Sequence, residues 1–421
     1  MSGGKAAPDK LDGIRQPPFP LTNHVLETLP RNRYAFALLA YAFAAIMVGT
    51  TLPTPMYALY ADRIHFGVLT TTVIYATYAF GVLFALVAFG RWSDAVGRRP
   101  LLLAGTAAAL CSAVVFLIAG SVPLLLIGRV LSGLSAGIFT GTATAAVIEA
   151  APPDWRNRAP AVATAANVGG LGGGPLLAGL LVQYTPQPLH LTFMVHIGMV
   201  LLAAAAVLVV PETSERSGTI GLQRLAVPFE VRGVFVIAGI AAFAGFAVTG
   251  LFASVAPAFL SGVVGIDNHA VAGAVASAVF IASAATQLFA GRVDPKRALT
   301  IGCAILVVGM VILTVALLFS SLWGLIAAAI VGGVGQGICF SRGLAAVSEL
   351  TPAGRRAEIS SAYFVVAYVA ISVPVIGEGL AARLWGLRTA GVSFAAAVAV
   401  LAGLCLVAIV IRERRQAAVT A

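Results

Sequence analysis

The sequence contains little charge. Lys, Arg, Asp and Glu make up only 10% of the 421 residues, whereas hydrophobic residues make up 60%. A soluble globular chain carries about 25% charged residues, so this composition excludes an ordinary soluble domain and indicates a chain that crosses a membrane several times. A net charge of +10 could attract nucleic acid in a soluble protein. Here the basic residues follow the expected membrane topology instead, and no nucleic-acid partner is expected.

Cysteine is also scarce. The four cysteines, Cys111, Cys303, Cys339 and Cys405, all lie in apolar stretches. They lack the spacing of a disulfide framework or a metal site, so we expect free thiols, no metal and no cofactor. No Gly-Lys-Ser or Gly-Lys-Thr loop is present to bind ATP phosphates. The apolar stretches lack the clustered His, Asp or Cys residues of a membrane-embedded enzyme. The sizeable extramembrane domain that would support a sensor is missing too.

Twelve apolar stretches reach the length of about 20 residues that a spanning helix needs. The longest polar break between them, Pro211–Arg232, divides them into two sets of six. The predicted domains are a cytosolic tail (1–33), a six-helix bundle (34–210), a cytoplasmic linker (211–232), a second six-helix bundle (233–411) and a cytosolic tail (412–421). No apolar run with a small-residue cleavage site marks residues 1–33 as a signal peptide. The spans are expected to start near Ala35, Thr70, Pro100, Pro123, Ala159, Leu189, Gly233, Ala270, Ala298, Leu322, Ile359 and Ala390.

The basic residues predict the orientation of the chain. With the N-terminus inside, the cytoplasmic tails and loops hold 21 of the 26 Lys and Arg residues. The outer loops hold only Arg63, Arg383 and Arg388, while Arg129 and Arg342 lie within spans. Because cytoplasmic loops carry the excess of basic residues in membrane proteins, both termini are predicted to face the cytoplasm.

The two halves of the chain are related by a shift of 200 positions. This shift aligns Leu131–Arg158 with Val331–Glu358, and nine of the 28 aligned pairs are identical. The shared residues include an uncommon Glu-x-x-Pro-x-x-x-Arg element. A repeat of this kind predicts an all-α polytopic membrane protein made of two parallel six-helix units.

A charged turn joins the second and third apolar stretches. It reads Gly90-x-x-x-Asp94-x-x-Gly97-Arg98-Arg99, and a reduced copy with Asp294 stands in the second half. The pattern resembles the signature turn of the major facilitator superfamily, which implies that family's twelve-helix transporter fold. The resemblance also implies that the glycines let two helix ends approach closely and that the acidic residue meets the N-terminus of a helix from the other half. The paired arginines are expected to stay in cytoplasmic solvent.

Four further charged residues fall at inner loop boundaries beside this turn. They are Glu149 and Arg156 with their repeat copies Glu349 and Arg356. We hypothesise that they form ion pairs between the halves, which close the cytoplasmic gate when the cavity opens outward. Each surface pair is weak, but a network present in only one state can bias an equilibrium.

Arg129 lies inside the fourth span. A buried arginine in a span is costly and usually faces a cavity or a partner, although partial snorkelling to the outer surface is an alternative. The spacing Arg129-x-x-x-Gly133 is similar to the fourth-helix motif of the family. That resemblance implies a role for Arg129 in proton coupling.

The fifth span carries small residues at every fourth position, which allow a neighbouring helix to approach closely. The run Gly170-x-x-x-Gly174-Pro175-x-x-Ala178-Gly179 is similar to the motif of the antiporter branch of the superfamily. It departs from that motif where Ala178 replaces a glycine. Pro175 is expected to kink or loosen the helix. The resemblance implies export rather than uptake, and generic close packing is the alternative explanation.

Glu378 is the only carboxylate more than about one turn inside a predicted span. An isolated carboxyl group in an apolar setting can exchange protons, so Glu378 is the first candidate for the proton carrier. The alternative is that it faces water at the outer end or pairs with Arg383. Polar residues that could line a substrate cavity are Arg342, Asn167, Gln287 and Gln336.

These observations predict a secondary active transporter that works by alternating access. The expected activity is proton-coupled efflux of small amphipathic or cationic compounds. Uptake of a metabolite by symport or facilitated diffusion is the alternative, with a non-transporting membrane sensor as a distant one. The expected partners are a small-molecule substrate, protons and the lipid bilayer. We expect a monomer. The expected location is a bacterial inner membrane, since the Ala, Gly and Val content is typical of a GC-rich bacterial source.

Overall fold

The computed structural model describes residues 24–216, 218–294, 297–352 and 355–420. The described residues form helices joined by short connections, without a strand among them. Within the described part of the chain, twelve helical segments are long and apolar enough to cross a membrane, which confirms the predicted number of spans. Residues 1–23 of the predicted N-terminal tail lie outside the described residues.

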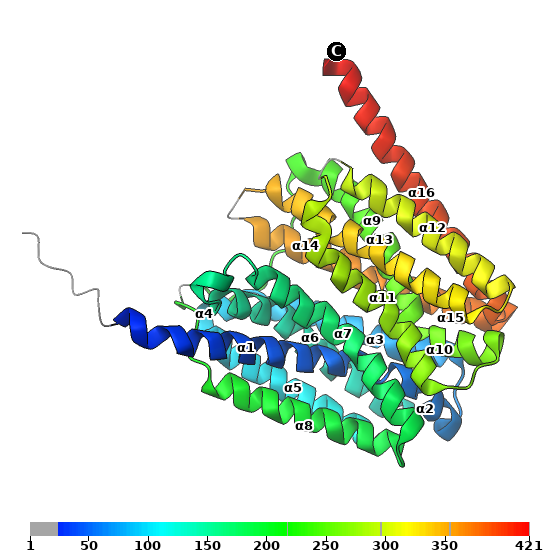
Figure 1. Cartoon of the computed structure of the whole chain (residues 1–421), viewed down its shortest axis with the longest axis horizontal. Helices are drawn as coiled ribbons and strands as arrows, with labels where there is room; N and C mark the ends of the chain where they lie inside the picture. The colour runs from blue at the N-terminus through cyan, green and yellow to red at the C-terminus, as the bar shows by residue number, and fades with distance from the viewer. Residues whose placement is uncertain (1–23, 217, 295–296, 353–354, 421) are drawn as a thin grey trace, which may run out of the picture.

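The helices fall into two sets of six spans (Figure 1). The first set contains α1 (His24–Thr51), η1 (Thr54–Met56), α2 (Tyr57–Ile64), α3 (Val68–Phe89), α4 (Trp92–Val96), α5 (Arg98–Leu117), α6 (Val122–Glu149), η2 (Pro153–Trp155), α7 (Ala159–Tyr184) and α8 (Pro188–Val209). The second contains η3 (Phe229–Val231), α9 (Arg232–Ser254), α10 (Ala256–Phe259), η4 (Leu260–Val264), α11 (His269–Phe289), η5 (Ala290–Arg292), α12 (Ala298–Leu318), α13 (Leu322–Glu349), α14 (Arg356–Ala370), α15 (Val373–Trp385) and α16 (Leu387–Thr420).

Two spans are built from more than one helix. The first runs through α1, η1 and α2, and the eleventh runs through α14 and α15 with a break at Ile371 and Ser372. Helix α16 continues to Thr420, so the predicted C-terminal tail begins as a helical extension of the last span. Broken helices leave backbone groups without intrahelical partners, and two of these breaks lie next to the sites described below.

The repeat predicted from the sequence is visible in the packing. Helices α6 and α13 begin and end at positions 200 residues apart. A Cβ atom added at Gly137 would lie 2.8 Å from the carbonyl oxygen of Val82, and one added at Gly337 would lie 2.8 Å from that of Ser283. In each half, therefore, the same glycine lets the fourth span pack directly on the backbone of the second.

Contacts between the halves are closest on the side opposite the linker. There α7 packs on α11, and α15 packs on α3. The side chain of Gln183 on α7 accepts a hydrogen bond of 2.9 Å from the backbone N–H of His269. With the linker on the cytoplasmic side, as the basic residues predict, this packing closes the outer side of the molecule.

Candidate functional site

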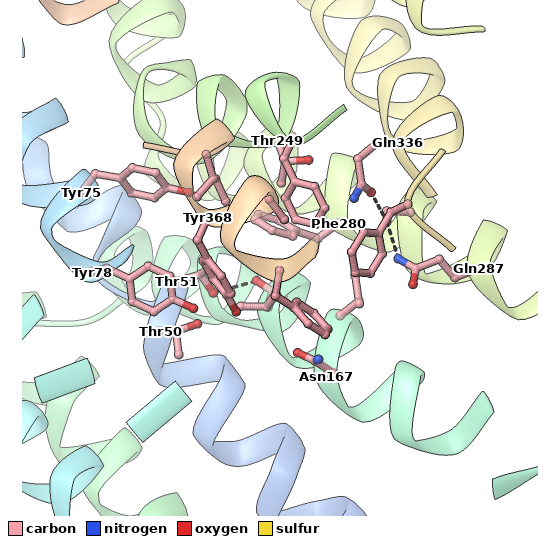
Figure 2. A pocket seen from close by; sticks show the side chains of 18 of the residues that line it. Thr50, Thr51, Tyr75, Tyr78, Asn167, Thr249, Phe280, Gln287, Gln336 and Tyr368 are labelled. Carbon is pink, nitrogen blue, oxygen red and sulfur yellow. Dashed lines mark hydrogen bonds between the residues drawn. The ribbon is translucent and has the colours of Figure 1, made fainter. Parts of the chain in front are cut away.

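A cavity of about 70 Å³ lies between the two halves. That volume holds a few water molecules, so a larger molecule could enter only if the surrounding helices move. Figure 2 shows Tyr75 and Tyr78 on one side, Gln287 and Gln336 on the other, and Asn167 below them. The full lining is Thr50, Thr51, Tyr75, Tyr78, Arg129, Asn167, Val168, Leu171, Phe246, Thr249, Phe280, Ser283, Gln287, Gln336, Phe340, Phe364, Ala367, Tyr368 and Ile371.

Arg129 is fixed at the wall of this cavity. Its side chain is only 1% exposed, so it does not snorkel to the surface. One guanidinium nitrogen donates to the Thr50 carbonyl at 2.5 Å, which is free to accept because α1 ends at Thr51. The other donates to the Tyr75 carbonyl at 3.3 Å, and the guanidinium lies 4.8 Å from the centre of the Tyr78 ring. The Nε atom has no partner among the described residues.

Amide side chains of the second half line the cavity opposite Tyr75 and Tyr78 (Figure 2). The Gln287 amide donates a hydrogen bond of 2.9 Å to Ser283, whose hydroxyl donates in turn to the Gln336 oxygen. Gln287 and Gln336, together with Asn167 of the first half, lie where the sequence predicted. Arg342 was predicted beside them and does not line the cavity. Phe340, two residues before Arg342 on α13, faces the cavity. Because two residues along a helix rotate the side chain by about 200°, Arg342 lies on the opposite face of α13.

Seven aromatic rings line the cavity, and the sequence interpretation did not select them. Tyr78 of the first half and Tyr368 of the second meet edge to face with ring centres 6.2 Å apart. Phe340 packs against Phe246 at 5.0 Å and against Phe364 at 5.7 Å. Offset and edge-on rings of this kind offer flat apolar surfaces. The available signal was the helical spacing of Tyr75 with Tyr78 and of Phe364 with Tyr368.

The cavity carries one formal charge. Arg129 is positive, and no carboxylate stands among the described residues that line the cavity. A positive charge held in an apolar site attracts an anion or the negative end of a dipole and repels a cation. With the rings and amides, this lining suits a flat, neutral or anionic molecule with polar substituents.

The fifth-span motif places its small residues against two different helices. A Cβ atom at Gly170 would lie 2.7 Å from the Ala44 carbonyl of α1, and one at Gly179 would lie 2.5 Å from the His269 carbonyl of α11. The motif therefore packs α7 on its own half and on the other half. Pro175 lacks the N–H that would reach Leu171, and the Thr51 hydroxyl donates to the Leu171 carbonyl at 2.7 Å instead.

Glu378 lies away from the central cavity. It lines a separate groove between α9, α15 and α16. Its side chain is 3% exposed, and neither carboxylate oxygen has a hydrogen-bond partner among the described residues. The alternative that Glu378 faces water or pairs with Arg383 is therefore wrong, because its position on α15 turns it into the bundle. The next residue, Gly379, packs directly against Thr72 of the other half.

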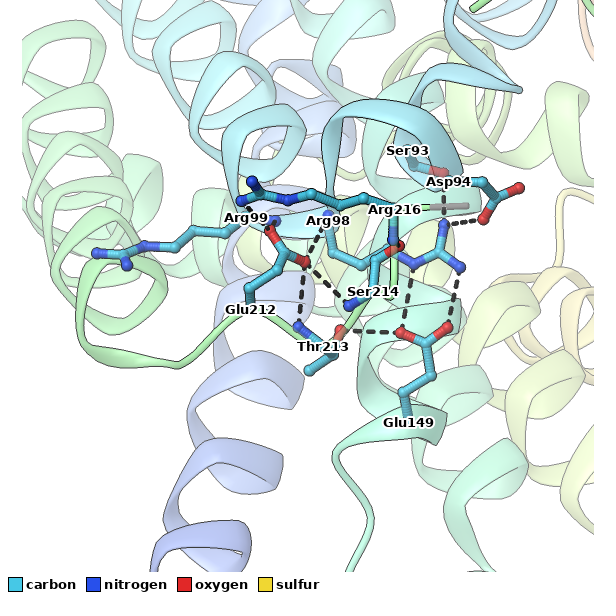
Figure 3. A network of polar contacts seen from close by, with 9 residues as sticks. All are labelled: Ser93, Asp94, Arg98, Arg99, Glu149, Glu212, Thr213, Ser214 and Arg216. Atoms are coloured by element: carbon cyan, nitrogen blue, oxygen red, sulfur yellow. Dashed lines mark hydrogen bonds and ion pairs between the residues drawn. The ribbon is translucent and has the colours of Figure 1, made fainter. Parts of the chain in front are cut away.

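The charged turn forms a network at the linker side (Figure 3). The Arg98 guanidinium binds both oxygens of Glu149, with the shorter contact at 2.9 Å, and lies 2.6 Å from Asp94. It also donates to Ser93 at 2.6 Å. Only 12% of the Arg98 side chain is exposed, so the expectation that it stays in solvent is wrong. It is covered because Glu149 approaches from α6 and the linker lies over the turn.

The linker covers this network. The Glu212 carboxylate accepts hydrogen bonds from the backbone N–H groups of Arg98 at 2.8 Å and Arg99 at 3.2 Å. It thereby caps the first turn of α5, whose N–H groups have no intrahelical acceptors. Gly97 has a φ of 114°, and a Cβ atom there would strike Glu212. Glycine is therefore required at this position for both the backbone conformation and the cap.

Burial raises the pKa of Glu212, while four backbone N–H groups that donate to its carboxylate lower it more. They belong to Ser214, Arg98, Arg99 and Thr213. The net result is a pKa below the ordinary value. Glu212 therefore stays ionised on the linker surface, where it holds the linker against the Asp94 turn.

The second-half copy of the network contains different contacts. Arg355 pairs with Glu358 at 3.2 Å, and Arg356 donates to the Thr351 carbonyl at 3.3 Å. Glu349 and Asp294 are exposed. The ion pairs of Arg33, Arg98 and Arg355 each join residues of one half, and that of Arg216 lies within the linker. The predicted pairs between the halves stay a prediction for the outward-open state.

The chain is similar to proteins of known family across its length. The profile of the Major Facilitator Superfamily matches residues 34–373 and 238–420. The tetracenomycin C resistance and export protein of Streptomyces glaucescens is 24% identical over 211 residues, which is 50% of this chain and 38% of that protein. The class E tetracycline resistance protein of Escherichia coli is 31% identical over 117 residues, or 26% of this chain and 29% of that protein. The matched segments thus span well under two thirds of either relative.

Solved structures share the fold. A bacterial homolog of the human lysosomal transporter Spinster, in an inward-facing and unoccupied conformation, has a TM-score of 0.71 at 16% identity, covering 90% of this chain and 97% of that one. A nucleoside transporter has a TM-score of 0.70 at 13% identity, covering 89% and 99%. The twelve spans, the repeat and the profile match agree. The chain belongs to the major facilitator superfamily of membrane transporters.

Proposed function

We propose that this chain is a proton-coupled exporter of small amphipathic compounds that works by alternating access. The observation that carries the proposal is the position of Glu378. A carboxyl group that is buried and without a partner stands one residue from Gly379, which touches Thr72 of the other half. The proposed proton site and the contact between Gly379 and Thr72 would therefore share the short helix α15.

Coupling follows from the cost of burying charge. A bare carboxylate in this position is expensive unless it gains a proton or a counter-ion. Loss of the proton from Glu378 then favours movement of α15 toward water, which loosens the contact between Gly379 and Thr72. Proton binding favours the closed outer side. Transport needs only that the two protonation states prefer different positions of α15.

The cargo is expected to bind in the central cavity, beside Arg129. The cavity supports amphipathic cargo because flat aromatic walls face amide groups and one guanidinium. A cationic cargo is less suited to this site, since Arg129 would repel it and no described lining residue offsets that charge. Asn167, Gln287 and Gln336 would bind the polar edge of the molecule.

The direction of transport is proposed from two sources. The fifth-span run around Pro175 resembles the antiporter motif and packs α7 on both α1 and α11. Two relatives are described as resistance or export proteins. Uptake by symport is the second candidate, favoured by the amide groups of Gln287 and Gln336, which could bind a small polar metabolite.

The remaining features of the proposal concern location and gating. We place the chain in a bacterial inner membrane as a monomer, with the linker and both termini in the cytoplasm. In the outward-open state Asp94, Glu149, Arg156, Glu349 and Arg356 would form the cytoplasmic gate. Arg98 would then exchange part of its present network for contacts across the halves.

Purified chain in liposomes tests the proposal. A trapped pH-sensitive dye would report proton movement on addition of tetracycline, with a lipophilic cation as the contrasting probe. We expect tetracycline-linked proton flux in the wild type and in Glu230→Gln, an exposed carboxylate on the linker side, and loss of that flux in Glu378→Gln. Equal flux in Glu378→Gln would keep the exporter and reject Glu378. Facilitated movement of a polar metabolite without proton flux would favour the uptake alternative.

A further inference from the structure

The groove that contains Glu378 is larger than the central cavity. It has a volume of about 320 Å³, against about 70 Å³ between the halves. Its walls come from α9, α15 and α16 and belong entirely to the second half. The lining is Phe243, Ala247, Pro374, Gly377, Glu378, Ala381, Ala390, Ser393, Phe394, Ala397, Val398 and Leu401.

Glu378 is the one ionisable side chain among the described residues of this lining. On α9 and α16 the groove is faced by apolar residues and by the hydroxyl of Ser393. On α3, the next helix packed against α15, Thr72 faces the neighbouring Gly379. Arg383 lies on α15 itself and is exposed. The described residues that line the groove thus supply no positive charge to a buried carboxylate, which is costly to leave without a counter-ion.

The groove opens sideways, toward the hydrocarbon of the bilayer. Gly377, Ser393 and Ala397 line it and are exposed on the outside of the helix bundle. They lie within the eleventh and twelfth spans. A Cβ atom added at Gly377 would meet no atom within 4 Å. A molecule dissolved in the membrane can therefore enter the groove without passing through the central cavity. The carboxylate oxygens of Glu378 are covered in the present state, so pairing with a bound molecule requires the side chain to turn toward the groove.

We propose that this lateral groove binds an amphipathic amine taken up from the bilayer. The ammonium group pairs with the Glu378 carboxylate, and the apolar body lies against Phe243 and Phe394. A metal ion does not suit the groove, because one carboxylate and one hydroxyl supply far fewer oxygens than a hard cation requires. A neutral lipid chain would fill the walls and leave the carboxylate without a counter-charge.

The amine and the proton are alternatives at the same carboxylate. An alkylammonium group stays charged up to a pH of about 10, so below that pH the charge of Glu378 decides whether the amine binds. Binding of the amine weakens as the pH falls. The groove is separate from the cavity proposed for the exported cargo, and the inference does not rest on the direction or the coupling of transport.

Binding of tritiated octylamine to the full chain in phosphatidylcholine nanodiscs tests the assignment, after subtraction of uptake by empty nanodiscs. We expect saturable binding at pH 8 that weakens toward pH 6. Loss of a charge-assisted pair should weaken binding about ten- to a hundredfold in Glu378→Gln. Gly377→Leu fills the groove while retaining the carboxylate, and we expect a similar loss. Gly198→Leu adds the same side chain at an exposed membrane position without neighbours within 4 Å and should bind as the wild type does.

Three results would overturn the assignment. They are the absence of saturable binding by the wild type, undiminished octylamine binding by Gly377→Leu, and equal binding of tritiated octanol. The last would identify a groove for lipid chains. If Glu378→Gln does not fold, the comparison of Gly377→Leu with Gly198→Leu still decides the question. A chain that binds octylamine but moves no protons would refute the proposed exporter and leave this site intact.

Discussion

Gly273→Ala is expected to shift the balance between the two access states. Gly273 lies on α11 and faces Pro175 on α7, where the two halves meet on the side opposite the linker. A Cβ atom there would come well within 3.0 Å of the Pro175 carbonyl oxygen. The obstacle is backbone, which has no rotamer to change, so α11 must move away from α7. Separation of the halves on this side relieves the clash completely.

The size of the shift follows from the cost of overpacking. Forcing one extra methyl group into a packed contact costs about 1–3 kcal/mol. This cost falls on the present state and is absent from a state in which α7 and α11 have separated there. The equilibrium should therefore move about 5- to 150-fold toward the state that is open opposite the linker. An equilibrium that favoured the present state tenfold would be balanced or reversed.

Spin labels on the linker side would measure this shift. We would place them at Asn157 and Leu350, which are exposed on different halves, and measure their distance distribution by pulsed electron resonance. Cys111 is exposed and must be replaced, whereas the other three cysteines are buried. Gly273→Ala should increase the population with the shorter distance. Gly198→Ala has no atom within 4 Å of the new Cβ and should leave the distribution unchanged. Equal distributions in the two variants would refute the reasoning.

Three further outcomes are expected. Because the pKa of Glu212 in the folded chain is below its unfolded value, its cap stabilises the fold above about pH 4.5, and this stability is lost as the pH falls through the folded-state pKa. The free energy of unfolding of Glu212→Gln should therefore be lower by about 0.5–2 kcal/mol near neutral pH. Its unfolding temperature, measured by thermal melts in detergent, should fall less on acidification than that of the wild type. Arg129→Lys keeps the charge but cannot reach two carbonyls and the Tyr78 ring together, so affinity for an anionic aromatic probe should fall about tenfold or more; unchanged affinity would remove Arg129 from the cargo site. Asp94→Asn should alter thermal stability by less than about 1 kcal/mol, since Asp94 is 55% exposed, yet it should impair transport in liposomes; full transport would reject the proposed gate.

Hydropathy was sufficient to predict the spans because each needs one long apolar run. A polar residue within a span needs a partner or a cavity. This reasoning selected Asn167, Gln287 and Gln336, which line the cavity, and also Arg342, which does not. The aromatic walls could not be selected in this way. On α3, Tyr75 and Tyr78 are buried at the cavity, while Phe80 and Phe84 are exposed to the membrane. In an apolar span both kinds of ring suit the hydropathy pattern, and only tertiary packing separates them.

Two site features depended on chain segments far apart in sequence. Arg98 was expected in solvent because its neighbours in sequence are polar. It is covered because Glu149 approaches from α6 and the linker lies over the turn. Glu378 was expected to be an isolated carboxyl group, and it is buried without a hydrogen-bond partner among the described residues. Its groove could not be predicted, because α9 and α15, which form two of its walls, are more than 100 residues apart.

The separation of Arg129 from Glu378 constrains how proton binding could act on cargo. One lines the cavity between the halves, and the other lines a groove within the second half, so coupling by a direct ion pair between them is not available. Helix α3 connects the two sites. Its Thr72 touches α15 at Gly379, and Tyr75, which binds Arg129 through its carbonyl, lies three residues further along on the same face. We infer that a movement of α15 set by the protonation of Glu378 would be transmitted through α3 to the cavity wall. Such coupling requires a rigid element whose position depends on both sites, and α3 contacts both.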